Sequence, residues 1–136
     1  MLSPAVAFAG SSPPASSVMQ VDGTFTTAVV PCAGLCTQSE YQGDLEGTTE
    51  FVMTSLEVTR NPAVSRYTGN LVLHTDDGDL IGTDVGYWNT TTGKYTDTYR
   101  ITSGTGVYEG VSGSILSVSR GENSPFTDDT VHLTWP

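Results

Sequence analysis

Short runs rich in β-branched and aromatic residues, separated by turn residues, recur along most of the chain. The longest is TTEFVMTSLEVT at 48–59, which stops at the turn signal Arg60-Asn61-Pro62. No segment has the 3.6-residue apolar period of a helix. We expect strands at 23–30, 48–59, 67–75, 80–88, 94–102, 114–119 and 130–135, with loops at 32–43 and 121–129. About seven or eight strands joined by short turns predict an antiparallel barrel or sandwich.

One stretch late in the chain, SGTGVYEGVSGS at 103–114, is unusually rich in glycine. Glycine is favoured where the backbone turns sharply, takes positive φ or approaches another backbone closely. Gly104 and Gly106 therefore predict a tight, irregular turn, from which Tyr108 points inward as a plug. Gly110 and Gly113 would let the next strand begin bent.

The charge of the chain excludes several classes of partner. The 136 residues favour a single domain, and the net charge is −10, from 15 acidic and 5 basic residues. Nucleic-acid binding needs basic patches that displace counterions, and an anionic membrane surface repels an acidic chain. No apolar run approaches the roughly 20 residues of a membrane span. We expect no nucleic-acid partner and no membrane insertion, and the excess acid favours solubility.

The first 17 residues, MLSPAVAFAGSSPPASS, differ in composition from the rest. Ala7-Phe8-Ala9 has the small-x-small form of a signal-peptidase site, although no positive charges precede it. A linker of Ser, Pro and Ala follows at 10–17. We expect 1–17 to be a signal-peptide remnant and flexible linker, and 18–136 to be the single folded domain. The protein would then be exported, with residence in the cytoplasm as the alternative.

The cysteines and histidines do not indicate a metal site. Cys32 and Cys36 could form a local disulfide in an oxidising compartment or a free dithiol in the cytosol. Together with the distant His74 and His132 they lack the spacing of zinc ligands. The acidic turn at 76–79 lacks the ligand pattern of a calcium loop. With no nucleophile elbow and no phosphate-binding loop either, we expect no metal and no cofactor.

The strand at 94–102 carries the strongest candidate for chemistry. Successive residues of a strand face opposite sides, so Tyr95, Asp97, Tyr99 and Ile101 share one face. If that face is internal, a carboxyl in an apolar cavity has a raised pKa and can act as general acid or base. Tyrosine hydroxyls can donate to a developing enolate oxygen. A structural, hydrogen-bonded Asp97 at the mouth of a barrel is the alternative.

Other candidates come from neighbouring strands. Glu50 lies on the opposite strand face from Phe51 and Met53, and both faces are partly apolar. One face would line a cavity and the other would pack against a neighbour, so Glu50 is a second catalytic candidate. The face of Phe51 and Met53 would contact substrate or, if it is outward, allow a homodimer. The other aromatic residues that we expect to contact a substrate are Tyr87, Trp88, Tyr108 and Trp135.

Three segments in order resemble a known group of small barrels. The glycine-rich stretch resembles the GTG-x-(aromatic)-x-G-x-x-G segment of allene oxide cyclase, dirigent and related calycin-like barrels. GDLEGTTEFVM at 43–53 and YTGNL at 67–71 resemble segments of a bacterial family of unknown function with the same predicted barrel. The resemblance spans roughly residues 21–136. It implies an eight-stranded antiparallel up-and-down β-barrel with a central cavity. Residues 32–36 and 76–79 depart from the pattern, and no catalytic residue of the plant cyclases aligns here.

The resemblance also implies a function. Relatives bind apolar small molecules in the cavity, and some direct cyclisations, cycloadditions or isomerisations of natural-product type without a cofactor. Here Asp97, Glu50, Tyr95 and Tyr99 would orient or polarise a carbonyl. Most of the rate would come from fixing a reactive conformer and excluding water. The alternatives are a secreted protein that carries an apolar ligand unchanged and a fully packed structural or inhibitory barrel.

Overall fold

The computed structural model describes residues 16–24, 28–124 and 126–136, with only the backbone of 16–22, 24 and 29. The predicted signal-peptide remnant and most of the linker, 1–15, lie outside the described residues. Strand β1 begins at Ser16, inside the predicted linker. The strands are β1 Ser16–Thr24, β2 Ala28–Val30, β3 Cys36–Tyr41, β4 Gly47–Val58, β5 Val64–Thr75, β6 Gly78–Asn89, β7 Tyr95–Gly104, β8 Ser112–Ser119 and β9 Phe126–Thr134.

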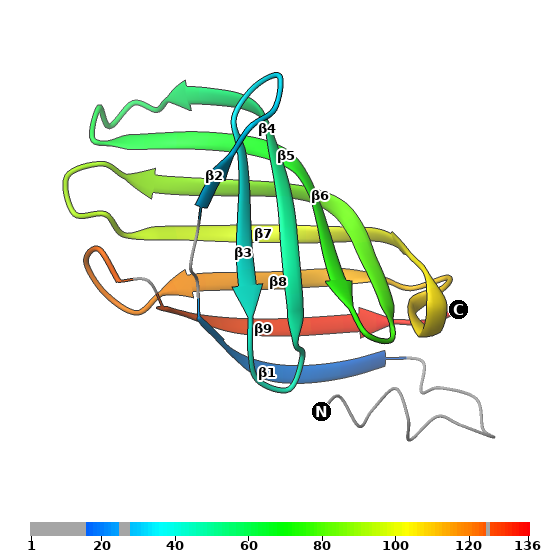
Figure 1. Ribbon diagram of the computed structural model, residues 1–136. Coiled ribbons are helices and arrows are strands. Elements are labelled where there is room, and N and C mark those ends of the chain that lie inside the picture. Colours follow the sequence, from blue (N-terminus) through cyan, green and yellow to red (C-terminus); the bar gives the residue numbers. More distant parts are fainter. Residues whose placement is uncertain (1–15, 25–27, 125) are drawn as a thin grey trace.

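All nine strands form one antiparallel sheet in the order β1-β9-β8-β7-β6-β5-β4-β3-β2. The order puts β1 and β2 at opposite edges, although only residues 25–27 separate them in the sequence. Four residue steps span at most about 14 Å, so the two edges must come near each other. The sheet therefore curls over, with β3 crossing in front of it (Figure 1) and approaching β1. A contact across the interior supports this curl, because Tyr41 Oη on β3 lies 3.3 Å from Ser117 Oγ on β8.

The prediction of an all-β antiparallel fold is confirmed, but the eight-stranded closed barrel is wrong. The sheet has nine strands, and no ladder between the described residues of β1 and β2 closes it. Two sequence predictions explain the miscount. Residues 36–41, predicted as loop, form β3, and the run predicted at 23–30 contributes to two strands, β1 and β2. The predicted loop at 121–129 also ends early, because β9 starts at Phe126.

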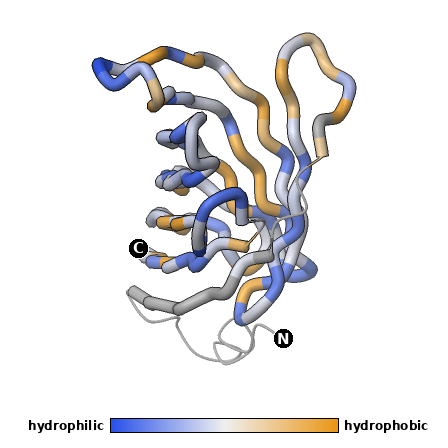
Figure 2. The backbone as a smooth tube through the Cα atoms, turned by 90° about the vertical axis from the view of Figure 1, so that its left-hand side faces the viewer, coloured by the Kyte–Doolittle hydropathy of each residue, from blue (hydrophilic) through white to orange (hydrophobic). Residues whose placement is uncertain are grey.

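Buried and exposed residues alternate along much of the strands. Figure 2 shows how hydrophobic and hydrophilic stretches are distributed along the backbone of the curled sheet. In β7 the predicted faces are confirmed: Tyr99 and Ile101 are buried, whereas Thr98 and Arg100 are exposed. Strand β4 changes its alternation at a bulge between Met53 and Ser55. An extra residue in one strand of a pair reverses which side chains face inward. Because of the bulge, Leu56 pairs with Tyr67 and faces the interior near the end of β4.

The core fills one end of the curled sheet. Its buried members include Leu45, Leu73, Leu80, Ile101, Tyr108, Val111, Ile115, Val131, Leu133 and Trp135. The 3-10 turn η1, Gly106–Tyr108, covers this end between β7 and β8 (Figure 1). Gly106 has φ 60°, a backbone conformation that side chains disfavour, and Tyr108 is only 1% exposed. The predicted inward plug is therefore confirmed, and it closes this end of the sheet.

In the described part of the chain, no helix has the length and apolar character needed to cross a membrane.

Candidate functional site

The concave side of the sheet encloses a cavity of about 720 Å³, within the range of small-molecule sites. Most of its wall is apolar or aromatic and comes from β4, β5, β6 and β7. The lining residues are Leu35, Thr37, Ser39, Tyr41, Thr49, Phe51, Met53, Leu56, Tyr67, Leu71, Asp84, Trp88, Tyr95, Asp97, Tyr99 and Ser117. The cavity thus lies between the packed end of the sheet and the opposite, open end.

The mouth of the cavity is apolar. Leu56 lies near the end of β4, and Trp88 and Tyr95 flank the β6–β7 connection. Leu35 comes from the β2–β3 loop, where a disulfide joins Cys32 and Cys36 and the Leu35 carbonyl accepts a hydrogen bond from the Met53 N–H at 2.9 Å. Leu35, Leu56 and Trp88 are each between 42% and 56% exposed. An apolar molecule could therefore enter here without crossing a charged rim.

A polar row crosses the wall of this cavity. The strand register aligns Tyr67 on β5, Gly86 on β6, Asp97 on β7, Ser117 on β8 and Asp129 on β9. Because residues opposite one another in a sheet share a face, the side chains of this row are neighbours. Tyr67 Oη donates a hydrogen bond to Asp97 Oδ2 at 2.7 Å. The ring of Tyr67 also packs edge-on against Phe51, with centroids 6.0 Å apart.

Gly86 makes the contact between Tyr67 and Asp97 possible. It lies between them in the row, and a Cβ at this position would overlap the ring and hydroxyl of Tyr67. A glycine here lets the tyrosine lie flat across β6 and reach the next strand. The missing side chain at Gly86 thus leaves the space that the Tyr67 ring occupies.

Asp84 joins Asp97 to form a pair of carboxyl groups. It precedes Gly86 by two residues on β6, and so shares its face. Its side chain hydrogen-bonds to that of Asp97. Asp84 is only 6% exposed, lines the cavity, and its Oδ1 atom has no hydrogen-bond partner. Two adjacent carboxyl groups in such a place share a proton more readily than they ionise together.

The environment raises the pKa values of this pair. Burial, followed by the charge of Asp97, raises the pKa of Asp84 to about 8. Burial likewise raises the pKa of Asp97 to about 6, although the hydrogen bond from Tyr67 acts in the opposite direction. Burial also raises the pKa of the fully buried Asp129, against the effect of the Ser117 and Thr127 hydroxyls. Near neutral pH the pair therefore contains both a proton donor and a proton acceptor.

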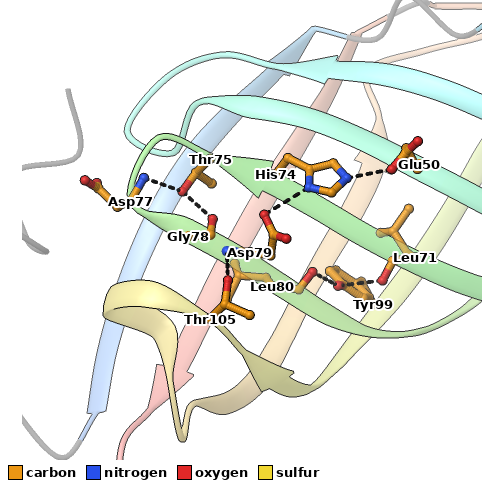
Figure 3. A network of polar contacts seen from close by, with 10 residues as sticks. All are labelled: Glu50, Leu71, His74, Thr75, Asp77, Gly78, Asp79, Leu80, Tyr99 and Thr105. Carbon is orange, nitrogen blue, oxygen red and sulfur yellow. Dashed lines mark hydrogen bonds and ion pairs between the residues drawn. The ribbon is translucent and has the colours of Figure 1, made fainter.

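The predicted catalytic residues separate into two groups. Asp97, Tyr95 and Tyr99 line the cavity together, as their shared face predicts. The Tyr99 hydroxyl is already engaged, since it donates to the carbonyls of Leu71 at 2.9 Å and Leu80 at 2.6 Å (Figure 3). Tyr99 is therefore placed to support the wall. The fourth candidate, Glu50, is exposed on the other face of β4 and is not brought together with Asp97.

Glu50 belongs instead to a polar cluster on the outer surface (Figure 3). His74 Nε2 lies 2.6 Å from Glu50 Oε2, and His74 Nδ1 lies 2.9 Å from Asp79 Oδ1. Hydrogen bonds to Glu50 and Asp79 raise the pKa of His74 above its ordinary value. Across the described residues, no group of three or more His, Cys, Asp or Glu side chains is arranged to hold a metal ion. The cluster ties β4 to β5 and β6 on the surface.

The predicted substrate-contacting residues also divide. Phe51, Met53 and Trp88 line the cavity. Because Phe51 and Met53 face inward, a homodimer would have to use another surface. Tyr87 is 47% exposed and does not line the cavity. Tyr108 and Trp135 belong to the packed core at the closed end, where the Trp135 indole donates to the Val107 carbonyl at 3.2 Å.

The sequence reasoning missed Asp84 and Tyr67. Strand alternation contained the signal for both: Asp84 shares its parity with Leu80 and Trp88, and Tyr67 shares its parity with Leu71. What the sequence lacked was the register between strands. Only the pairing of β5, β6 and β7 brings these two side chains to Asp97.

No protein-family model matches the chain, and no curated protein matches it significantly. The similarity to allene oxide cyclase-like barrels therefore rests on the sequence motifs and stays a prediction.

Proposed function

We propose that this protein is a small β-sheet enzyme that binds a mostly apolar molecule in its cavity and directs its isomerisation or cyclisation without a cofactor. One observation carries the proposal: the hydrogen-bonded carboxyl pair of Asp84 and Asp97 lies in the wall of a largely apolar cavity. Perturbed carboxyl groups in a concave apolar site are common in general acid–base catalysis.

The pair would work as a proton relay. Asp97, as carboxylate, takes a proton from a carbon next to a substrate carbonyl, and protonated Asp84 donates a hydrogen bond to the enolate oxygen that forms. Asp97 then returns its proton at another carbon, so the mass of the substrate is unchanged. Tyr67 is a positioning residue that holds Asp97 through its hydroxyl. The apolar wall fixes the folded conformer and excludes water.

A second candidate function is a carrier that releases the same ligand unchanged. The cavity and its apolar mouth support this function as well, whereas a volume of about 720 Å³ argues against a fully packed structural barrel. The disulfide between Cys32 and Cys36 supports the predicted export for either function, because disulfides persist in oxidising compartments.

The test uses small-molecule extracts of the producing cells. The extract is incubated with the protein, and liquid chromatography with mass spectrometry searches for compounds that convert to products of identical mass and different retention time. We expect such a conversion with the wild-type protein and its loss with Asp97→Asn. Glu50→Gln is the matched control, because it also removes a carboxylate but lies outside the cavity.

Native mass spectrometry of the protein purified from its producer accompanies this assay. A bound molecule that never converts to a compound of equal mass would favour the carrier over the enzyme. A conversion that survives Asp97→Asn unchanged would refute the role of the carboxyl pair.

A further inference from the structure

The lining of the cavity contains carboxyl groups but no cationic side chain. Its lining includes Asp84 and Asp97, with Asp129 behind Ser117, but none of its lining residues is basic. The side chains that the structure leaves undescribed cannot supply a base, because residues 1–29 and Pro125 contain no Lys, Arg or His. All basic residues lie in the described part and outside the lining: Arg60, Arg66, His74, Lys94, Arg100, Arg120 and His132.

A hydrogen-bond acceptor in this lining is left free. Asp84 is only 6% exposed, and its Oδ1 atom has no hydrogen-bond partner. Its other contacts are the Asp97 side chain and the backbone near Val85. A buried acceptor without a donor costs free energy that a ligand donor can recover. Asp84 is a lining residue of the cavity, so a small shift of its carboxyl group would let a bound molecule supply the missing donor.

The charge of the pair defines that donor further. With one shared proton, Asp84 and Asp97 together carry one negative charge, and no cationic side chain in the cavity neutralises it. A buried charge is expensive unless it is paired. A ligand ammonium group would neutralise this charge and donate to the free oxygen, whereas a ligand carboxylate would be repelled.

We propose that the cavity selects an apolar molecule that carries a protonated amine, with its ammonium group held by Asp84 and Asp97. This inference rests on the proposed function and names its substrate class. The ammonium anchors the substrate at the carboxyl pair, and the apolar remainder lies against Phe51, Met53 and Trp88. Asp97 keeps its hydrogen bond from Tyr67 and stays next to the reacting part of the substrate.

The selection depends on pH through the carboxyl pair. Of the described side chains, the titratable groups that face the pair are Tyr41 from β3, Tyr67 from β5, Tyr95 and Tyr99 from β7, and Asp129 from β9. The described lining of β4 and β8 contributes no titratable side chain. Because the tyrosines stay neutral in the acid range, only carboxyl protonation removes the negative charge there. Amine binding should therefore weaken as the pH falls below about 6.

The test compares three probes with the same ring system by isothermal titration calorimetry. These are 1-naphthylmethylamine, a cation at neutral pH, the neutral 1-naphthalenemethanol and the anionic 1-naphthoic acid. At about pH 7.5 we expect the amine to bind at least about tenfold more tightly than the alcohol, and the acid to bind most weakly. At about pH 4.5 the preference for the amine should disappear, and this arm needs no variant.

The variants separate the carboxyl pair from the general acidity of the protein. Asp84→Asn with Asp97→Asn should bring the affinities for amine and alcohol together. The matched control is Asp44→Asn with Asp76→Asn, which removes the same charge from exposed residues outside the cavity and should keep the preference. If the cavity double variant does not fold, judged by circular dichroism, Asp84→Asn alone takes its place.

The outcomes distinguish this inference from the proposed function. Equal binding of amine and alcohol, or an amine preference that survives the loss of both cavity carboxylates, overturns the amine inference but leaves the cavity as a site for apolar molecules. Failure of all three probes to bind overturns the amine inference and removes the support that the cavity gives to the proposed function.

Discussion

At the scale of single residues, the candidate site depends on one hydroxyl and one absent side chain. The Tyr67 hydroxyl reaches Asp97 at 2.7 Å, and it does so across Gly86, where any Cβ would overlap it. The hydrogen bond favours the ionised form of Asp97, whereas burial favours the protonated form. These two opposing effects leave the pKa of Asp97 near the pH at which a general base is useful.

Tyr67→Phe tests this balance, because it keeps the ring and removes only the hydroxyl. We expect the pKa of Asp97 to rise above its value of about 6, since the donor that stabilises the carboxylate is lost. The measurement is an NMR titration of the aspartate side-chain carbons. Tyr87→Phe, on the exposed outer face, is the control and should leave the titration unchanged. An unchanged Asp97 titration in Tyr67→Phe would mean that the hydrogen bond does not set its pKa.

At the scale of elements, the mouth of the cavity is built from a bulge and a crosslinked loop. The bulge after Met53 turns Leu56 inward, and the β2–β3 loop brings Leu35 to the same opening. The Cys32–Cys36 disulfide closes the segment that carries Leu35. The disulfide thus restrains the loop that carries Leu35 to the mouth of the cavity.

Replacing both cysteines, Cys32→Ser with Cys36→Ser, should lower the free energy of unfolding by about 2 kcal/mol, because the crosslink closes only a very short loop. It should also weaken the binding of 1-naphthalenemethanol, since Leu35 loses its fixed position. Urea unfolding and calorimetry measure the two effects. Leu35→Ala is the comparison: it should weaken binding with a smaller change in stability. Unaltered probe affinity in the cysteine variant would show that the loop does not shape the mouth.

At the scale of the whole molecule, the curl of the sheet concentrates acidic groups on its concave side. Asp84, Asp97 and Asp129 come from three different strands, and burial raises the pKa of each. Between the ordinary aspartate value near 4 and these raised values, the folded state binds more protons than the unfolded state. The free energy of unfolding must therefore fall as the pH rises through this window.

Asp84→Asn should flatten this pH dependence, because an amide cannot ionise. The free energy of unfolding of the wild-type protein should fall between about pH 4 and pH 8, and about 5 kcal/mol of this loss should be absent in the variant. Urea unfolding across this range is the measurement. His74→Gln is needed as a control, because the stabilisation from a raised histidine pKa is also lost as the pH rises. His74 is part of a surface cluster, so its share should be below about 1 kcal/mol. A wild-type protein whose stability rises from pH 4 to pH 8 would contradict the burial of these carboxyl groups.

Local patterns along the chain were enough to predict the class of fold and much of one strand face. Alternation of apolar and polar residues marked most of the strands, and it placed Tyr95, Asp97 and Tyr99 on a common inner face. The glycine-rich stretch indicated the turn that buries Tyr108. These features are local, because strand periodicity and turn formation depend on neighbours in the sequence. The short strand β3 was missed for the same reason, since Cys36–Tyr41 follows a loop and carries mostly polar residues.

The contacts between residues of different strands depend on the folded sheet. Register pairs Gly86 with both Tyr67 and Asp97, and it brings Asp84 beside Asp97 on the next strand. The sequence pattern predicts one unbroken alternation along β4, but the bulge after Met53 reverses it. The direction in which the sheet curls leaves Glu50 outside the cavity. Pairing between strands is a long-range property that a period of two residues cannot specify. The candidate residues could therefore be found one strand at a time, whereas the carboxyl pair exists only in the folded sheet.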